Sequence, residues 1–144
     1  QAIRLTTLVD NTIARQVTLL STPLCTVPVE RIEKVYKKQG DTFAKRLLSD
    51  VELLEFSNQF YPERFLAKRW ALKEAVSKAL GTGISQGVRF KDMTVGHKES
   101  GQPILFLSGS TLDKSNQLGI TDWAISISDE KHHTVAFVVA EQRL

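Results

Sequence analysis

The sequence predicts an α+β fold in which helices pack on an antiparallel sheet. Apolar residues recur at helical spacing between residues 29 and 80, and beyond residue 84 the spacing changes to alternation. Helices that come first and strands that follow are typical of α+β domains. A chain of 144 residues has the length of one domain with its own hydrophobic core.

Residues 29–58 are predicted to form two helices with a short helical turn between them. Apolar residues three and four apart predict a helix over 29–38, and Gly40 ends it. A short turn is expected at 42–48. Ser49 and Glu52 have the spacing of a capping box, which opens a helix that ends near residue 58.

The longest predicted helix covers 62–80. Pro62 suits its first turn, and Gly81 can adopt the left-handed conformation that ends it. Small residues at every fourth position form a ridge that lets another element approach closely: Ala67, Ala71, Ala75 and Ala79.

The second half predicts strands joined by turns and one short helix. We expect a strand over 88–90 and 94–97, a turn at 99–103, a returning strand at 104–107, a helix at 110–117, and strands at 123–128 and 134–139 joined by residues 129–133.

Composition restricts the function without deciding it. The net charge of +3 is too small to imply a partner, but its basic residues gather in the predicted helices at 30–46 and 63–78. This pattern suggests an anionic ligand or partner, although an ordinary solvated helix face produces it too. Cys25, the single cysteine, fits a reducing compartment, so we expect a cytoplasmic protein. We expect no membrane span, because no run of about 18 uncharged apolar residues is present.

Glu74 and Lys78 are four residues apart on the longest helix, so both side chains reach the same region. A carboxylate beside a lysine could hold a hydrated divalent ion next to phosphate oxygens. On spacing alone, an exposed surface pair is the simpler interpretation. The Walker phosphate-binding motif is missing from the sequence.

The run RFLAKRWALKEAVSKALGTG at 64–83 resembles the signature of the holo-acyl-carrier-protein synthases, the small bacterial 4'-phosphopantetheinyl transferases. The family pattern is approximately R-F-L-A-x-R-(F/W)-A-x-K-E-A-x-x-K-A-x-G-T-G. Shorter similarities at 29–32, 43–49 and 101–103 occur in the same order, so the resemblance extends over about 27–139.

The resemblance implies transfer of the 4'-phosphopantetheine arm of coenzyme A to a serine of apo-acyl carrier protein, with adenosine 3',5'-bisphosphate as the other product. It also implies a Mg²⁺ ion at the coenzyme A pyrophosphate, with Mn²⁺ as a possible substitute. A metal-bound water or a nearby carboxylate would deprotonate the serine. Carried over, the family roles make Glu74 and Lys78 catalytic, Glu74 a metal ligand, and Arg69, Lys73, Lys78, Gly81, Thr82, Gly83 and Pro103 the coenzyme A site.

The family also implies partners. Acyl carrier proteins are acidic, so Arg31, Lys34, Lys38 and Arg46 are candidates to dock one. A homotrimer with sites between subunits, a place in fatty acid biosynthesis, and no nucleic-acid or membrane partner are expected on the same basis.

The match fails in the first strand, where the family has a metal-binding Asp and this chain has Cys25. Residues 1–24 have no counterpart, so we divide the chain into an unmatched segment, 1–24, and a transferase domain, 25–144. A thiol is a poor ligand for Mg²⁺. Three explanations stay open: a folded but impaired relative, another carboxylate such as Asp10 in that place, or an altered N-terminal sequence, which we favour.

A second departure is Asp129, where many members of the family have His. It is either a base or supporting group, or a plain turn residue. We expect His132 and His133 at the surface and Trp70 and Trp123 in the core. The alternative function is a small basic nucleic-acid-binding module, but that needs exposed aromatic residues, and the aromatic residues are predicted to be buried.

Overall fold

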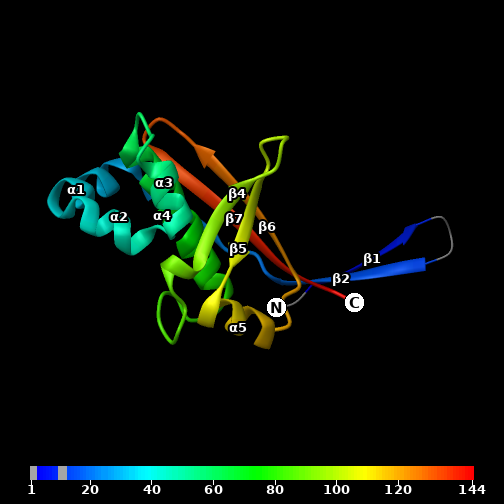
Figure 1. The fold of residues 1–144 in the computed structure, drawn as a ribbon. Coiled ribbons are helices and arrows are strands. Elements are labelled where there is room, and N and C mark those ends of the chain that lie inside the picture. The colour runs from blue at the N-terminus through cyan, green and yellow to red at the C-terminus, as the bar shows by residue number, and fades with distance from the viewer. Residues whose placement is uncertain (1–2, 10–12) are drawn as a thin grey trace.

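The computed structural model describes residues 3–9 and 13–144. Figure 1 shows α1 to α4 gathered on one side, the strands beside them, and α5 below the strands. The elements are β1 (Ile3–Val9), β2 (Ile13–Ser21), β3 (Leu24–Pro28), α1 (Val29–Gln39), α2 (Asp41–Leu47), α3 (Asp50–Phe56), α4 (Pro62–Ala79), the 3-10 turn η1 (Phe90–Asp92), β4 (Met93–His97), β5 (Pro103–Leu107), α5 (Gly109–Gln117), β6 (Asp122–Asp129) and β7 (His133–Arg143).

β7 is the central strand of the larger sheet. One edge of β7 pairs with β6, and the other edge pairs first with β3 and then with β2, all antiparallel. β1 continues the sheet beyond β2, while β4 and β5 form a separate two-stranded hairpin. The predicted α+β architecture is therefore confirmed.

Local sequence signals located the helices well. The capping box forms, with Ser49 N donating to Glu52 Oε1 at 3.0 Å and Glu52 N donating to Ser49 Oγ at 3.4 Å. Gly81 has φ of +83°, as its predicted cap role requires. The turn expected at 42–48 is a seven-residue helix, α2.

The strand predicted at 88–90 is wrong. Val88 N donates to Ser85 O, and Arg89 N donates to the hydroxyl of Thr111, so side-chain and turn partners take the bonds that a strand would use. The strand begins only at Met93, after η1. A second difference is at 3–9 and 13–21, which form β1 and β2 although their sequence shows no clear period.

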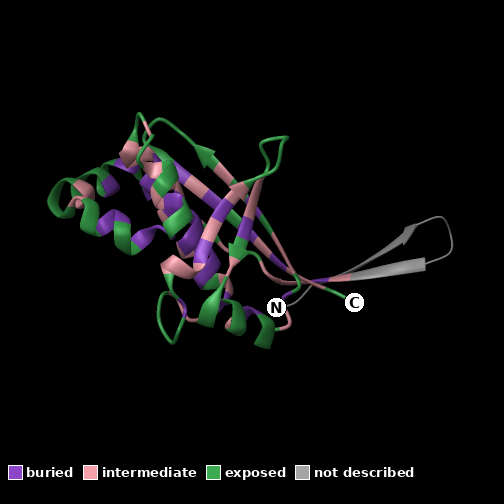
Figure 2. Cartoon of the chain, in the orientation of Figure 1, coloured by how far each residue is buried: buried purple, intermediate pink, exposed green. Residues whose placement is uncertain are grey.

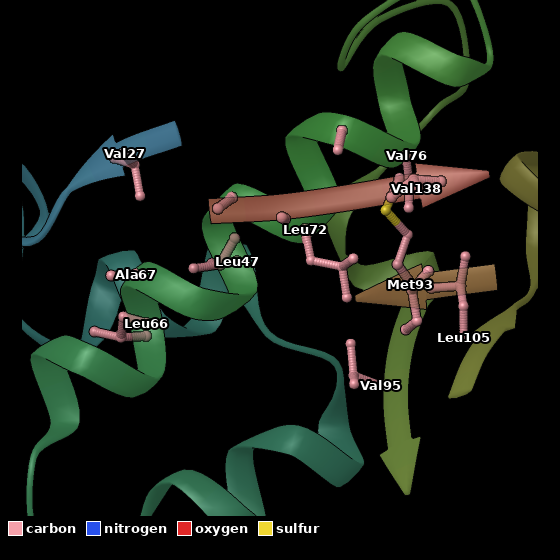
Figure 3. Packing of buried hydrophobic residues seen from close by; sticks show 14 of the residues in the cluster. Val27, Leu47, Leu66, Ala67, Leu72, Val76, Met93, Val95, Leu105 and Val138 are labelled. Carbon is pink, nitrogen blue, oxygen red and sulfur yellow. The ribbon is translucent and has the colours of Figure 1, made fainter. Parts of the chain in front are cut away.

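The alanine ridge of α4 packs on the sheet. Ala67, Ala71 and Ala75 are completely buried, as are Ala136 and Val138 on the facing side of β7. Figure 3 shows side chains of α4 meeting Val138, and Figure 2 shows the buried stripes along α4 and β7. The close approach that small residues allow fixes the orientation of α4 and thus of its charged side chains.

Trp70 and Trp123 are partly buried and pack against this core, which is close to the core positions predicted for them. Within residues 3–9 and 13–144, no helix has both the length and the apolar character needed to cross a bilayer.

Candidate functional site

The candidate site residues of α4 lie on opposite faces of the helix. Arg69 and Lys78 are nine residues apart, which places their side chains about 180° apart around the axis. Glu74 and Lys78 differ by only about 40°. We call the side of Arg69 and Lys73 the inner face, and the side of Glu74 and Lys78 the outer face.

The inner face is closed by a buried carboxylate, Glu52 of α3. One oxygen of Glu52 accepts from the ammonium of Lys73 and from Ser49 N, and the other accepts from Val95 N at 3.1 Å. Arg69 Nε lies 3.1 Å from the second oxygen, without hydrogen-bond alignment. The carboxylate thus joins α3, α4 and β4 inside the protein.

Lys73 is fully engaged at this carboxylate. Its side chain is 0% exposed, and its ammonium also donates to Leu47 O at 2.8 Å and Phe90 O at 3.2 Å. Burial lowers the pKa of Lys73 to about 8, and the charge of Glu52 opposes that shift. With three acceptors for three donors, Lys73 has no donor left for a ligand in this arrangement, so the coenzyme A contact expected of it finds no support here.

The outer face is open. Glu74 is half-buried and Lys78 exposed, and no ion pair joins the two side chains among the described residues. Cys25 of β3 lies within electrostatic range of both. Burial raises the pKa of the Cys25 thiol, the charges of Lys78 and Arg31 lower it, and that of Glu74 raises it further. The thiol of Cys25 is therefore close enough to Glu74 and Lys78 for their charges to act on it.

The donor set here is incomplete for a divalent metal. The described part of the chain contains no cluster of three His, Cys, Asp or Glu side chains with metal-site geometry. Glu74 can serve as one ligand of Mg²⁺ if substrate phosphates supply further oxygens, but the thiol of Cys25 does not suit this hard ion. Asp10, the other candidate, lies outside the described residues.

The loop after α4 continues the outer face beyond Lys78. Gly81 and Gly83 have φ of +83° and +63°, a region that side chains disfavour, and nothing lies within 4 Å of the place of a Cβ at either. The hydroxyl of Thr82 donates to Gly83 O at 2.8 Å. Space is therefore open beside both glycines, although their N–H groups already donate to Lys78 O and Ser77 O.

A second group of site residues meets on the inner side of α4. Arg69 and Pro103 line a cavity of about 300 Å³, together with Glu55, Gln59, Phe65, Lys68, His97, Gly101, Ile127 and Asp129. The Arg69 guanidinium stacks on Phe65 at 4.5 Å from the ring centroid. The predicted coenzyme A residues thus form two groups on opposite faces of one helix.

Asp129 has a structural partner as well as its place in this cavity. It accepts from Arg64 Nη1 at 3.2 Å and from the Thr134 hydroxyl at 3.3 Å, which ties the β6–β7 turn to α4. His132 and His133 are exposed beside this turn. The aromatic residues are less buried than expected, since Phe60, Tyr61, Phe106 and Phe137 are exposed.

The four predicted docking residues, Arg31, Lys34, Lys38 and Arg46, are all exposed. Lys34 pairs with Glu30 at 3.4 Å, and Arg46 donates to Gln39 at 3.2 Å, which connects α2 to the end of α1. Arg46 also borders a cavity of about 410 Å³ with Trp70 and Ile84. Arg31, Lys34 and Lys38 lie within about 60° of one another around α1, and the bond from Arg46 to Gln39 brings α2 beside the end of that helix.

Sequence reasoning missed Glu55 altogether and took Glu52 only as a helix cap. A signal for the buried carboxylate was present, because Arg69 and Lys73 share one arc of α4 with the buried Leu72 and Val76. Buried cations require a partner of opposite charge.

Three comparisons with known proteins point to the same family. The family model of the 4'-phosphopantetheinyl transferase superfamily matches residues 26–137. The chain is 55% identical over 117 residues to the holo-acyl-carrier-protein synthase of Hydrogenovibrio crunogenus, covering 81% of this chain and 92% of that protein. The crystal structure of holo-acyl-carrier-protein synthase from Neisseria meningitidis is similar, with a TM-score of 0.81 and 39% identity over 85% of this chain and 98% of that one. The Helicobacter pylori enzyme in complex with coenzyme A has a TM-score of 0.72 and 30% identity, covering 83% and 99% of the two chains.

Proposed function

The chain belongs to the 4'-phosphopantetheinyl transferase superfamily, and we propose that it transfers the 4'-phosphopantetheine arm of coenzyme A to a serine of apo-acyl carrier protein. The family resemblance inferred from residues 64–83 is confirmed. The observation that carries the function is the outer face of α4, where the charges of Glu74 and Lys78 act on Cys25 of β3 and a glycine loop follows the helix. Adenosine 3',5'-bisphosphate is the second product.

The reaction exchanges a phosphoanhydride bond of coenzyme A for a phosphate ester bond on the carrier protein. The serine hydroxyl loses its proton to a base such as a nearby carboxylate, its oxygen attacks the phosphorus that carries the pantetheine arm, and the bond from this phosphorus to the bridging oxygen breaks. Negative charge develops on the leaving nucleotide phosphate. We assign Lys78 to neutralise that charge, which is supported by its exposed side chain on the same face of α4 as Glu74.

Mg²⁺ is the ion that we assign to this reaction, with Glu74 as its protein ligand and Mn²⁺ as a substitute. When bound, it supplies positive charge to the pyrophosphate oxygens. Cys25 is not a ligand in this proposal, which leaves the chain one carboxylate short of the family pattern and predicts weak retention of the ion. An impaired relative remains the competing account.

A complete site requires two subunits in this proposal. Arg69 and Pro103 face one side of α4, while Glu74, Lys78 and the loop at 81–83 face the other. One coenzyme A molecule therefore contacts the inner side of one chain and the outer face of a second. The sheet face turned away from α4 supports such assembly, since Leu24 and Phe137 pair there and are exposed. A homotrimer is the closed assembly that we assign.

The partner is an acidic acyl carrier protein docked on Arg31, Lys34, Lys38 and Arg46. The proposed setting is the cytoplasm and fatty acid biosynthesis, where coenzyme A, carrier protein and a reduced Cys25 occur together.

The test is the intact mass of apo-acyl carrier protein after incubation with this protein, coenzyme A and magnesium. We expect a gain of one 4'-phosphopantetheine, and no gain with a carrier protein whose acceptor serine is replaced by alanine. Coenzyme A binding without any mass gain would favour the impaired relative. Failure to bind coenzyme A at all would contradict the proposed function.

A further inference from the structure

The contact between Arg69 and Glu55 has no place in the proposed transfer reaction. Glu55 Oε2 lies 3.6 Å from Arg69 Nη2, at the edge of the cavity that both residues line. The side chain of Arg69 is 4% exposed and that of Glu55 is 42% exposed. Glu55 therefore lies on the solvent side of the guanidinium and covers it.

The two carboxylates at Arg69 are held differently. Glu52 accepts bonds from Lys73, Ser49 N and Val95 N, so it is fixed inside the protein. For the Glu55 carboxylate, the contact with Arg69 is the one ion pair found among the described residues. A long, half-exposed bridge of this kind is weak and opens readily.

We propose that Glu55 is a built-in competitor for the anionic ligand at Arg69. The inference rests on the proposed function, which brings phosphate groups of coenzyme A to this cavity. A phosphate that reaches the guanidinium must displace the Glu55 carboxylate and then remain beside its negative charge. Glu55 thus weakens nucleotide binding and returns to Arg69 when the product leaves.

Charge in the cavity fits this account. Lys68 and His97 line it with Arg69, while Asp129, the other acid, is already held by Arg64 and Thr134. Neutralising Glu55 would leave a basic cavity whose buried guanidinium has lost its outer partner. Anion affinity should rise, because like charges a few ångströms apart repel strongly near a protein surface.

The experiment measures binding of adenosine 3',5'-bisphosphate by calorimetry to the wild type, Glu55→Gln and Glu63→Gln. Glu63 is the matched control, since it is a half-buried α4 carboxylate that borders a different cavity. We expect Glu55→Gln to bind about tenfold more tightly, with a gain that shrinks as salt screens the charge. Glu63→Gln should bind like the wild type.

Kinetics give a second readout that a purely structural role would not change. In Glu55→Gln the KM for coenzyme A and the inhibition constant of adenosine 3',5'-bisphosphate should fall together, at unchanged melting temperature. Equal or weaker nucleotide binding by Glu55→Gln, with normal binding by the wild type, would overturn this inference and leave the proposed function standing. If none of the three proteins binds the nucleotide, both fail.

Discussion

The two faces of α4 carry similar charged side chains in opposite surroundings. On the inner face, Lys73 and Arg69 are buried against Glu52, whereas on the outer face Glu74 is half-buried and Lys78 exposed. Lys73 and Glu74 are neighbours in the sequence and in the family motif. The comparison teaches that neighbours in one motif can have opposite surroundings, since the ammonium of Lys73 is enclosed by protein acceptors, whereas the side chain of Lys78 is exposed.

The largest expected effect is on stability and comes from the inner face. Glu52→Ala would leave Lys73 and Arg69 buried without their shared carboxylate, and we expect the free energy of unfolding to fall by about 3–5 kcal/mol. Urea denaturation measures this loss. Glu30→Ala, which breaks an exposed pair with Lys34, should change little. Similar small losses for both variants would mean that the buried cluster does not stabilise the fold.

Substitution on the outer face should lower the transfer rate and leave stability unchanged. Glu74→Gln keeps the size of the side chain and removes the charge assigned to the metal, so we expect transfer to fall at least about a hundredfold with an unchanged melting temperature. Carrier-protein mass against time measures the rate. Glu33→Gln, on an exposed position of α1, is the control. Near-normal transfer by Glu74→Gln would remove Glu74 from the site.

Substitutions in the proposed docking surface should have a smaller effect, and the effect should appear in the KM for carrier protein. Lys38 and Arg46 suit this test better than Arg31, whose charge reaches Cys25 and therefore the site itself. Reversing both to Glu should raise the KM for carrier protein about tenfold and leave coenzyme A affinity unchanged. Lys114→Glu on α5 is the control. If wild type and double variant respond alike to added salt, α1 and α2 form an ordinary solvated face.

The smallest effect concerns Cys25. Cys25→Asp restores the carboxylate of the family pattern at a position on which the charge of Glu74 acts, so we expect a few-fold rise in transfer at limiting magnesium that disappears at saturation. Cys25→Ser is the control, because it adds an oxygen without charge. A magnesium titration of the three proteins makes the comparison. Equal rates at every concentration would show that β3 does not contribute to the metal site.

The fold was predictable where local signals act. Helix limits followed from the capping box at Ser49 and from Gly81, because caps and periodicity depend on neighbouring residues. The strand expected at 88–90 was wrong, because Arg89 bonds to Thr111, which is distant in sequence. Such bonds leave no local pattern.

The site was predictable in part. Glu74 and Lys78 share a face by helical spacing alone, and the family motif gave them a role. Lys73 was assigned to coenzyme A through the family resemblance, yet its partner Glu52 lies on another helix, where no local pattern shows the pairing. The contact of Glu55 with Arg69 also joins two helices, so neither spacing nor composition predicted it.

The most direct test of the difference between the two faces is the transfer rate of Lys73→Met for each folded molecule. Met fills the volume of the lysine stem and leaves Glu52 with Arg69 as its charged partner. The variant should unfold at lower urea concentration than the wild type. Below its unfolding transition, its rate should stay within about threefold of the wild-type rate. A hundredfold loss of rate in a protein of normal stability would contradict the account and place Lys73 in the reaction.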